Sequence, residues 1–202
     1  FADQHLLYHL LLIPFLSLGL PPIWGVKLAT AFFAWLAILA LYFVLRYLNL
    51  RGAFWWTGLA LINAPFILRL NLAKANALAL AVFILACLAL IKKRHFLLFI
   101  LAFTAVWLHA SWPNILVVTL LYIFSSMIWE TIQNLIYEKK KKSIYYILST
   151  IYSLLLTKEN IKLLTASLGG LAAGLVFNPY FPKNLAFYRY QIFEIALKGY
   201  GK

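Results

Sequence analysis

Acidic and histidine side chains that could transfer protons or bind a metal gather near the start of the sequence. Asp3 precedes His5 and His9, and the two histidines are four residues apart, which places them on one face of a helix. A carboxylate beside two imidazoles could act as a general base or form part of a metal site. Alternatively, Asp3 caps the helix that follows, and both histidines are polar residues at a membrane surface. Both interpretations stay open, and a divalent metal is a candidate cofactor.

A second polar group surrounds Arg69 and Lys74, with Asn71 between them. Arginine can bind a phosphate through two parallel N–H donors, and lysine can bind one as a point charge. The same cations could instead extend to lipid headgroups without binding any particular substrate. Because ionisable residues at membrane depth commonly mark functional sites, binding of a phosphate or pyrophosphate is the functional interpretation of this group.

Two further groups combine polar side chains with proline turns. His109 and Trp112, just before Pro113, could line the opening of a pocket or belong to an aromatic belt at the membrane surface. Asn178 and Tyr180 lie in a proline-rich turn that could simply end a helix, or could also position the residues after it. The sequence contains no P-loop, dinucleotide-binding glycine pattern, nucleophile elbow or zinc motif.

The composition indicates which elements must position these residues. Hydrophobic residues make up 65% of the 202 residues, charged residues make up 11%, and the mean hydropathy is +0.89. Soluble domains contain about 25% charged residues, so the sequence predicts a membrane protein with lipids among its partners. The net charge of +13 is divided among short clusters between apolar runs, which is typical of topology signals and not of a nucleic-acid interface.

The apolar runs predict an all-α, polytopic transmembrane helical bundle. The first run, residues 5–18, is too short for a hydrocarbon core of about 30 Å, so we expect an N-terminal interfacial helix. Residues 143–156 are also short, and we expect them at the interface. A last span, residues 163–177, contains Gly169, Gly170 and Gly174, which would allow close contact with another helix. Five spans are expected between these segments, at residues 26–45, 53–70 with a kink at Pro65, 76–91, 96–109 and 114–129.

Basic residues near the ends of the runs predict the topology, because loops rich in lysine and arginine stay in the cytoplasm. Alternation places three basic clusters inside, at residues 46–51, 92–94 and 139–142. Residues 1–202 then form one transmembrane domain: 1–25 an exoplasmic loop with the interfacial helix, 26–129 the five spans, 130–162 a cytoplasmic basic loop with an interfacial segment, 163–177 a span, and 178–202 exoplasmic. The sequence opens on Phe1 and its only methionine is Met127, so we expect a piece of a longer protein.

Several short segments resemble the GT-C class of polytopic membrane glycosyltransferases. They are residues 3–9 (DQHLLYH), 66–69 (FILR), 107–113 (WLHASWP) and 177–182 (FNPYFP). The resemblance implies transfer of a sugar from a polyprenyl-phosphate-linked donor on the exoplasmic face of a bacterial or archaeal cell membrane. It implies that Asp3 deprotonates the acceptor or helps to hold a metal, and that Arg69 lies near the donor phosphate. The expected substrate-binding residues are His5, His9, Arg69, Asn71, Lys74, His109, Trp112, Asn178 and Tyr180.

A transporter or flippase subunit for a lipid or other amphipathic substrate is the alternative function. The same polar residues would then line a path through the membrane. Transporters typically contain internal repeats and helices that are interrupted at the midplane. The sequence contains no repeat, and its polar residues are expected at one end of the spans, so the glycosyltransferase is the preferred hypothesis.

Overall fold

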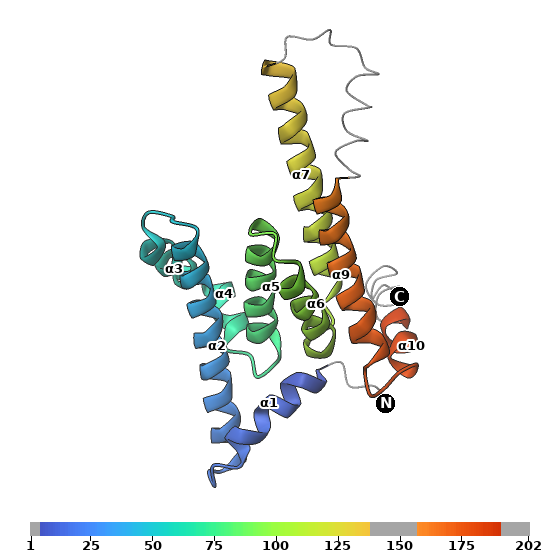
Figure 1. Cartoon of the computed structure of the whole chain (residues 1–202). Helices are drawn as coiled ribbons and strands as arrows, with labels where there is room; N and C mark the ends of the chain where they lie inside the picture. Colours follow the sequence, from blue (N-terminus) through green and yellow to red (C-terminus); the bar gives the residue numbers. More distant parts are fainter. Residues whose placement is uncertain (1–4, 138–156, 191–202) are drawn as a thin grey trace, which may run out of the picture.

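The computed structural model of the chain describes residues 5–137 and 157–190, and every secondary-structure element in this part is a helix (Figure 1). The predicted all-α fold is confirmed. The described helices are α1 (Leu6–Leu16), α2 (Pro22–Tyr47), α3 (Ala53–Ile62), α4 (Ala64–Leu70), α5 (Asn76–Ile91), α6 (His95–Leu108), α7 (Pro113–Tyr137), α9 (Lys158–Val176) and α10 (Lys183–Arg189).

Among the described residues, two helices are long and apolar enough to cross a membrane. They are α2, with 26 residues, and the part of α7 from Pro113 to Gln133, with 21 residues. The α3–α4 pair becomes a third candidate if it is counted as one bent span. At 1.5 Å per residue, the 16 residues of α5 and the 14 of α6 extend only about 24 and 21 Å. The arrangement of five spans in residues 26–129 therefore stays a prediction.

Residues 53–70 do not form the single kinked helix that we expected. Helices α3 and α4 meet at Asn63 with a bend of 87°. Asn63 is extended, and its side-chain oxygen accepts a hydrogen bond from the backbone N–H of Phe66 at 3.1 Å. This cap starts a new helix, and Pro65 has no N–H with which to continue the old one. We predicted only a kink, because we considered Pro65 and not the cap that Asn63 forms.

Three helices include residues that were expected in loops. Helix α7 continues eight residues past Trp129, and α9 begins at Lys158 instead of Leu163, so both ends of the predicted loop at 130–162 are helical. Thr157 caps α9 by accepting a hydrogen bond from the backbone N–H of Asn160 at 3.3 Å. Helix ends follow caps and propensity, and a helix therefore need not stop where its apolar run stops. Helix α10 lies within the predicted exoplasmic segment 178–202, and the interfacial segment expected at 143–156 lies outside the described residues.

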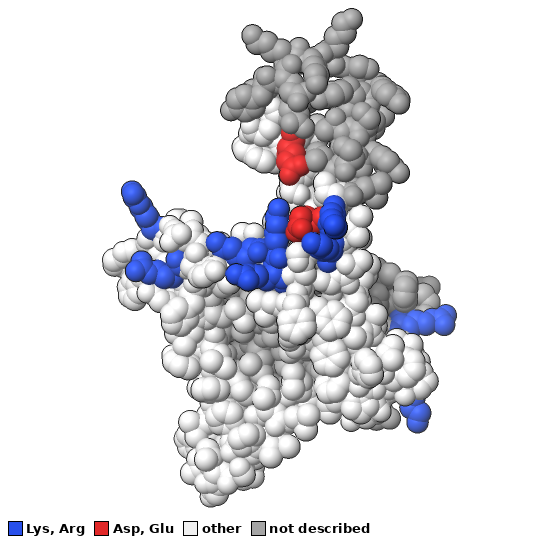
Figure 2. Space-filling view, viewed as in Figure 1, with Lys and Arg blue, Asp and Glu red and all other residues white. Residues whose placement is uncertain are grey.

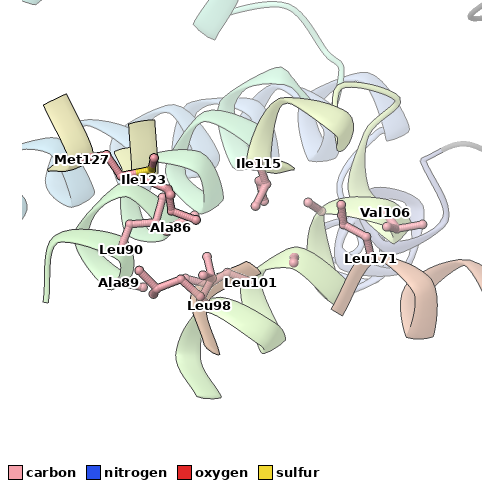
Figure 3. Close-up of a cluster of buried hydrophobic side chains, with 13 residues drawn as sticks. Ala86, Ala89, Leu90, Leu98, Leu101, Val106, Ile115, Ile123, Met127 and Leu171 are labelled. Atoms are coloured by element: carbon pink, nitrogen blue, oxygen red, sulfur yellow. The ribbon is translucent and has the colours of Figure 1, made fainter. Parts of the chain in front are cut away.

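Two clusters of buried side chains hold the helices together, and α5 contributes to both. One cluster joins the second half of α5 to α6, α7 and α9 (Figure 3). The other joins α1 and α2 to the first half of α5, where small residues such as Ala29, Ala37 and Ala77 are almost fully buried. Small side chains allow helix backbones to approach closely, as they do in membrane bundles.

Close packing is most evident between α6 and α9, as the glycines predicted. A Cβ atom on Gly170 would overlap the carbonyl oxygen of Phe99, and one on Gly174 would lie 2.9 Å from the carbonyl oxygen of Phe103. A Cβ on Gly169 would make an ordinary contact of 3.5 Å with the Phe99 ring. The indole N–H of Trp107 donates to the carbonyl oxygen of Gly174 at 2.9 Å. Gly170 and Gly174 thus bring two helices together at backbone distance.

Helix α1 is the short apolar helix that the sequence predicted. It runs obliquely across one end of the bundle in Figure 1 and packs on α2 and α6. Gly25 allows this approach, since a Cβ there would lie 2.8 Å from the carbonyl oxygen of Phe15. The orientation of α1 relative to a membrane stays a prediction.

Two groups of charged and histidine side chains lie at opposite ends of the helices. The cationic end contains the turns before α3 and α6 and the start of α9, where the Nζ atom of Lys92 lies 4.8 Å from the Tyr47 ring and His95 Nε2 lies 3.2 Å from Glu159 Oε2. Figure 2 shows most of the visible lysine and arginine atoms in one band. The histidine end contains His5, His9 and His109. The basic residues of the cationic end are Arg46, Arg51, Lys92, Lys93, Arg94, Lys158 and Lys162.

Candidate functional site

A pocket of ≈ 440 Å³ opens at the histidine end, between α4, the first half of α5 and the turn that joins α6 to α7. It brings together Arg69 and His109, which the sequence singled out from separate segments. Apolar and polar side chains share its wall, as is usual for sites that bind small molecules. The lining residues are Phe66, Arg69, Leu70, Leu72, Asn76, Ala79, Leu80, Phe83, His109, Ser111 and Asn114.

His109 is held in one defined state by the turn that contains it. Helix α6 ends at Leu108, and His109 has an extended backbone that directs the chain into the turn. Its Nδ1 atom accepts the backbone N–H of Ser111 at 3.0 Å and lies 2.8 Å from the Ser111 hydroxyl oxygen. An acceptor nitrogen carries no proton, so the ring is neutral with its proton on Nε2. Burial, with smaller contributions from the charges of His5 and Lys74, lowers the pKa of His109 below its usual value.

The three histidines of this end lie close to one another. The His5 ring lies 5.1 Å from the His109 ring and 6.4 Å from the His9 ring, measured between centroids. The Nδ1 atom of His5 donates to the carbonyl oxygen of Leu108 at 3.1 Å, which fixes the ring against the end of α6. His9 is exposed and does not line the pocket. The sequence placed His5 and His9 on one helix face, and the structure adds His109 to them.

Arg69 and Lys74 supply positive charge beside the pocket. Arg69 is in the last turn of α4, is exposed, and lines the pocket wall. Lys74 is exposed in the turn before α5, and its charge reaches His109. Asn71 is placed differently, because its Nδ2 atom donates to the carbonyl oxygen of Ile67 at 3.0 Å, outside the pocket lining. It ends α4 and has no contact that points to a ligand.

Trp112 lies beside this pocket rather than in it. With His109 and Ser111 it lines a second, much smaller cavity of ≈ 20 Å³. Its ring meets Tyr188 of α10 edge to face, with 5.7 Å between centroids. Trp112 therefore supports the turn that carries His109, and its buried Nε1 atom has no hydrogen-bond partner among the described residues.

Asn178 and Tyr180 lie in the turn between α9 and α10, and the structure does not bring them to the pocket. The Asn178 side chain is buried, with 4% of its surface exposed, and its Oδ1 atom accepts the backbone N–H of Tyr180 at 3.0 Å. The Tyr188 hydroxyl donates to the carbonyl oxygen of Val106 at 3.1 Å, which joins α10 to α6. These contacts are explained if the proline-rich turn simply ends a helix, which is the first of the two interpretations given above.

Asp3 lies outside the described residues, so its proposed catalytic role stays a prediction. Within residues 5–137 and 157–190, no group of three or more histidine, cysteine, aspartate or glutamate side chains could hold a metal ion. A divalent metal held by Asp3 therefore also stays a prediction.

The expected substrate-binding residues did not include three polar residues that line the pocket. Asn76 is the first residue of α5, Asn114 is the second of α7, and Ser111 holds the His109 ring. Polar residues at the start of an apolar run could have indicated the two asparagines, because helix starts at one end of a bundle lie near one another. Nothing in the sequence marked Phe83, which reaches the pocket only because α5 packs where it does.

Fold and site together define an all-α protein with two or three candidate membrane helices and a mixed apolar and cationic pocket at one end. Comparisons with family models, with curated proteins and with solved structures found no match for this chain.

Proposed function

We propose that this chain belongs to a membrane glycosyltransferase that takes its sugar from a polyprenyl-phosphate-linked donor. The observation that carries the proposal is the pocket of ≈ 440 Å³, in which Arg69 and a neutral His109 share a wall with Phe66 and Phe83. Such a donor has an anionic phosphate between an apolar chain and a polar sugar. A pocket for it needs a cation, apolar surface and a hydrogen-bond donor within a short distance of one another.

The proposal places the chain in a bacterial or archaeal cell membrane as a multi-pass protein. Large apolar side chains face outward along the helices, and Ile62 and Phe96 are 78% and 77% exposed. Lipid would cover these surfaces. The cationic end would face the cytoplasm by the rule for basic loops, and the histidine end would face the opposite side.

Arg69 would act on the leaving group. In the transfer, an acceptor oxygen attacks the anomeric carbon of the sugar, the bond from that carbon to the phosphate oxygen breaks, and the electron pair stays on the phosphate. A guanidinium group at the phosphate stabilises this developing charge, and Lys74 adds a second charge nearby. The Nε2–H group of His109 can donate to a phosphate oxygen or a sugar hydroxyl. Asp3 would take the proton of the acceptor.

The test is transfer of a radiolabelled sugar from polyprenyl-linked donors in membranes that contain the full-length protein. We expect Arg69→Ala and Asp3→Asn each to lower the rate by about 10²- to 10³-fold, as loss of one group that stabilises a transition state does. Arg51→Ala, at the cationic end, is the matched control and should retain the rate. If no donor supports transfer, or if both variants transfer as fast as the control, the proposal fails.

A transporter or flippase is the second candidate, and one observation favours it. The 87° bend between α3 and α4 is an interrupted helix beside the pocket, which is a feature of transporter binding sites. Movement of a fluorescent lipid between the leaflets of reconstituted vesicles, without any sugar transfer, would support this candidate over the first.

A further inference from the structure

A larger cavity than the pocket at the histidine end lies between α2 and α5 and extends to the cationic end. Its volume is ≈ 1060 Å³, and none of its lining residues belongs to the pocket at the histidine end. Leucine, alanine, valine and phenylalanine form most of its wall, and Arg46, Asn49 and Lys92 belong to its lining at the cationic end. We call this cavity the α2–α5 groove.

The length of the α2–α5 groove corresponds to one leaflet of a membrane. On α2 it extends from Leu36 to Tyr47, and the ten residue-to-residue steps from Leu36 to Arg46 rise about 15 Å along a helix. Half of a hydrocarbon core of about 30 Å is the same distance. An acyl chain whose headgroup lies at Arg46 would therefore fit along the groove.

The charge at the cationic end of the groove selects the headgroup. The lining contains two cations and no acidic side chain. The Nζ atom of Lys92 lies 4.8 Å from the Tyr47 ring, which holds the lysine over the α2 side of the groove. Basic pockets between membrane helices on the cytoplasmic side bind anionic lipid headgroups. A zwitterionic headgroup would bring its own positive charge to the same two cations.

We propose that the α2–α5 groove binds an anionic diacyl phospholipid of the leaflet at the cationic end. Arg46 and Lys92 contact its phosphate, and one acyl chain lies against Leu36, Ala40, Ala81 and Leu85. The lipid joins α2 to α5 at the end opposite to the candidate active site. This inference requires that the helices are in a membrane, but it does not rest on the glycosyltransferase proposal.

The first measurement is the melting temperature of the purified full chain in detergent, with dioleoylphosphatidylglycerol or dioleoylphosphatidylcholine added. A ligand at about 100 times its Kd stabilises a chain of this size enough to raise the Tm by about 5–10 °C. We expect that increase with phosphatidylglycerol and almost none with phosphatidylcholine. An equal increase with both lipids overturns the proposal.

Variants then locate the effect in the groove. Arg46→Gln with Lys92→Gln should weaken the phosphatidylglycerol affinity about 25-fold, fivefold for each cation. Arg51→Gln with Lys93→Gln removes the same charge from the same end outside the groove lining, and should leave the affinity unchanged. Equal loss in both double variants would mean that the lipid only meets general surface charge, and the proposal fails.

A third variant tests the apolar part while both cations remain. Ala40→Phe places a large ring in the groove, and it should remove the Tm increase with phosphatidylglycerol. A full increase in this variant would contradict an acyl chain in the groove, even if the charge variants do not fold. In the last measurement, the Tm is determined with polyprenyl phosphate added in phosphatidylcholine. If it stabilises the wild type and phosphatidylglycerol does not, the phospholipid assignment is wrong.

Discussion

Both ends of the molecule carry basic side chains, but the two ends hold them differently. At the cationic end, Arg46 and Lys92 are exposed on helix ends beside an apolar groove. At the histidine end, Ser111 fixes the His109 ring and the end of α6 fixes the His5 ring, while Arg69 and His109 line one pocket. The first arrangement suits attraction of an anionic surface, which needs charge without precise placement. The second suits recognition of one ligand, since fixed donors lose little freedom on binding.

Labelling of engineered cysteines gives the largest expected effect, because an end is either accessible from outside the cell or not. In a Cys87→Ser background, we expect cysteines at Leu72 and Lys183 to react with an impermeant maleimide on intact cells. A cysteine at Arg51 should react only after the membrane is permeabilised. The physical reason is retention of basic loops in the cytoplasm. Labelling of positions 72 and 183 from opposite sides would disprove the two-ended topology.

Helices α6 and α9 pack closely along the length between the two ends. Loss of this packing should decrease the stability of the chain more than any other change proposed here. The Gly170→Ala substitution forces a methyl group onto the carbonyl oxygen of Phe99, and overpacking of this kind costs about 1–3 kcal/mol. Gly169→Ala, on the same helix, meets the Phe99 ring at ordinary distance and serves as the control. We expect a clear decrease in Tm for the first variant and little change for the second. Equal Tm values would show that α6 and α9 can separate without cost.

Much of this arrangement follows from the sequence, because lipid-exposed helices must satisfy their backbone internally and their apolar runs are easily seen. The close contact at Gly170 was predicted from the small residues of one apolar run, and the nearness of His5 and His9 was predicted from their spacing of four residues. The break at Asn63 was not, because a cap depends on one side-chain hydrogen bond that leaves no periodic pattern.

The candidate site was predicted only in part, for a related reason. Arg69 and His109 are unusual residues in an apolar chain, and their types alone marked them. Asn178 is just as unusual, yet its side chain serves its own turn. Only the packing of α4, α5 and the turn after α6 decides which polar residues share a pocket, and sequence spacing carries no record of that packing.

The neutral state of His109 predicts a smaller effect, a pH dependence of stability that arises at the histidine end. Its folded pKa lies below the ordinary value of 6.5, so on acidification through that value the unfolded chain takes up protons before the folded chain does. The contribution of His109 to stability should therefore be constant above about pH 7 and decrease as the pH falls below 6.5. We expect the decrease in Tm between pH 7.5 and pH 5 to be smaller in His109→Gln than in wild type, since glutamine does not titrate. Asn76→Ala, which changes a pocket residue that does not titrate, is the control and should keep the wild-type decrease. If His109→Gln also shows the wild-type decrease in Tm, His109 binds protons equally in the folded and unfolded chains. The two ends would then not differ in how folding changes the protonation of their side chains.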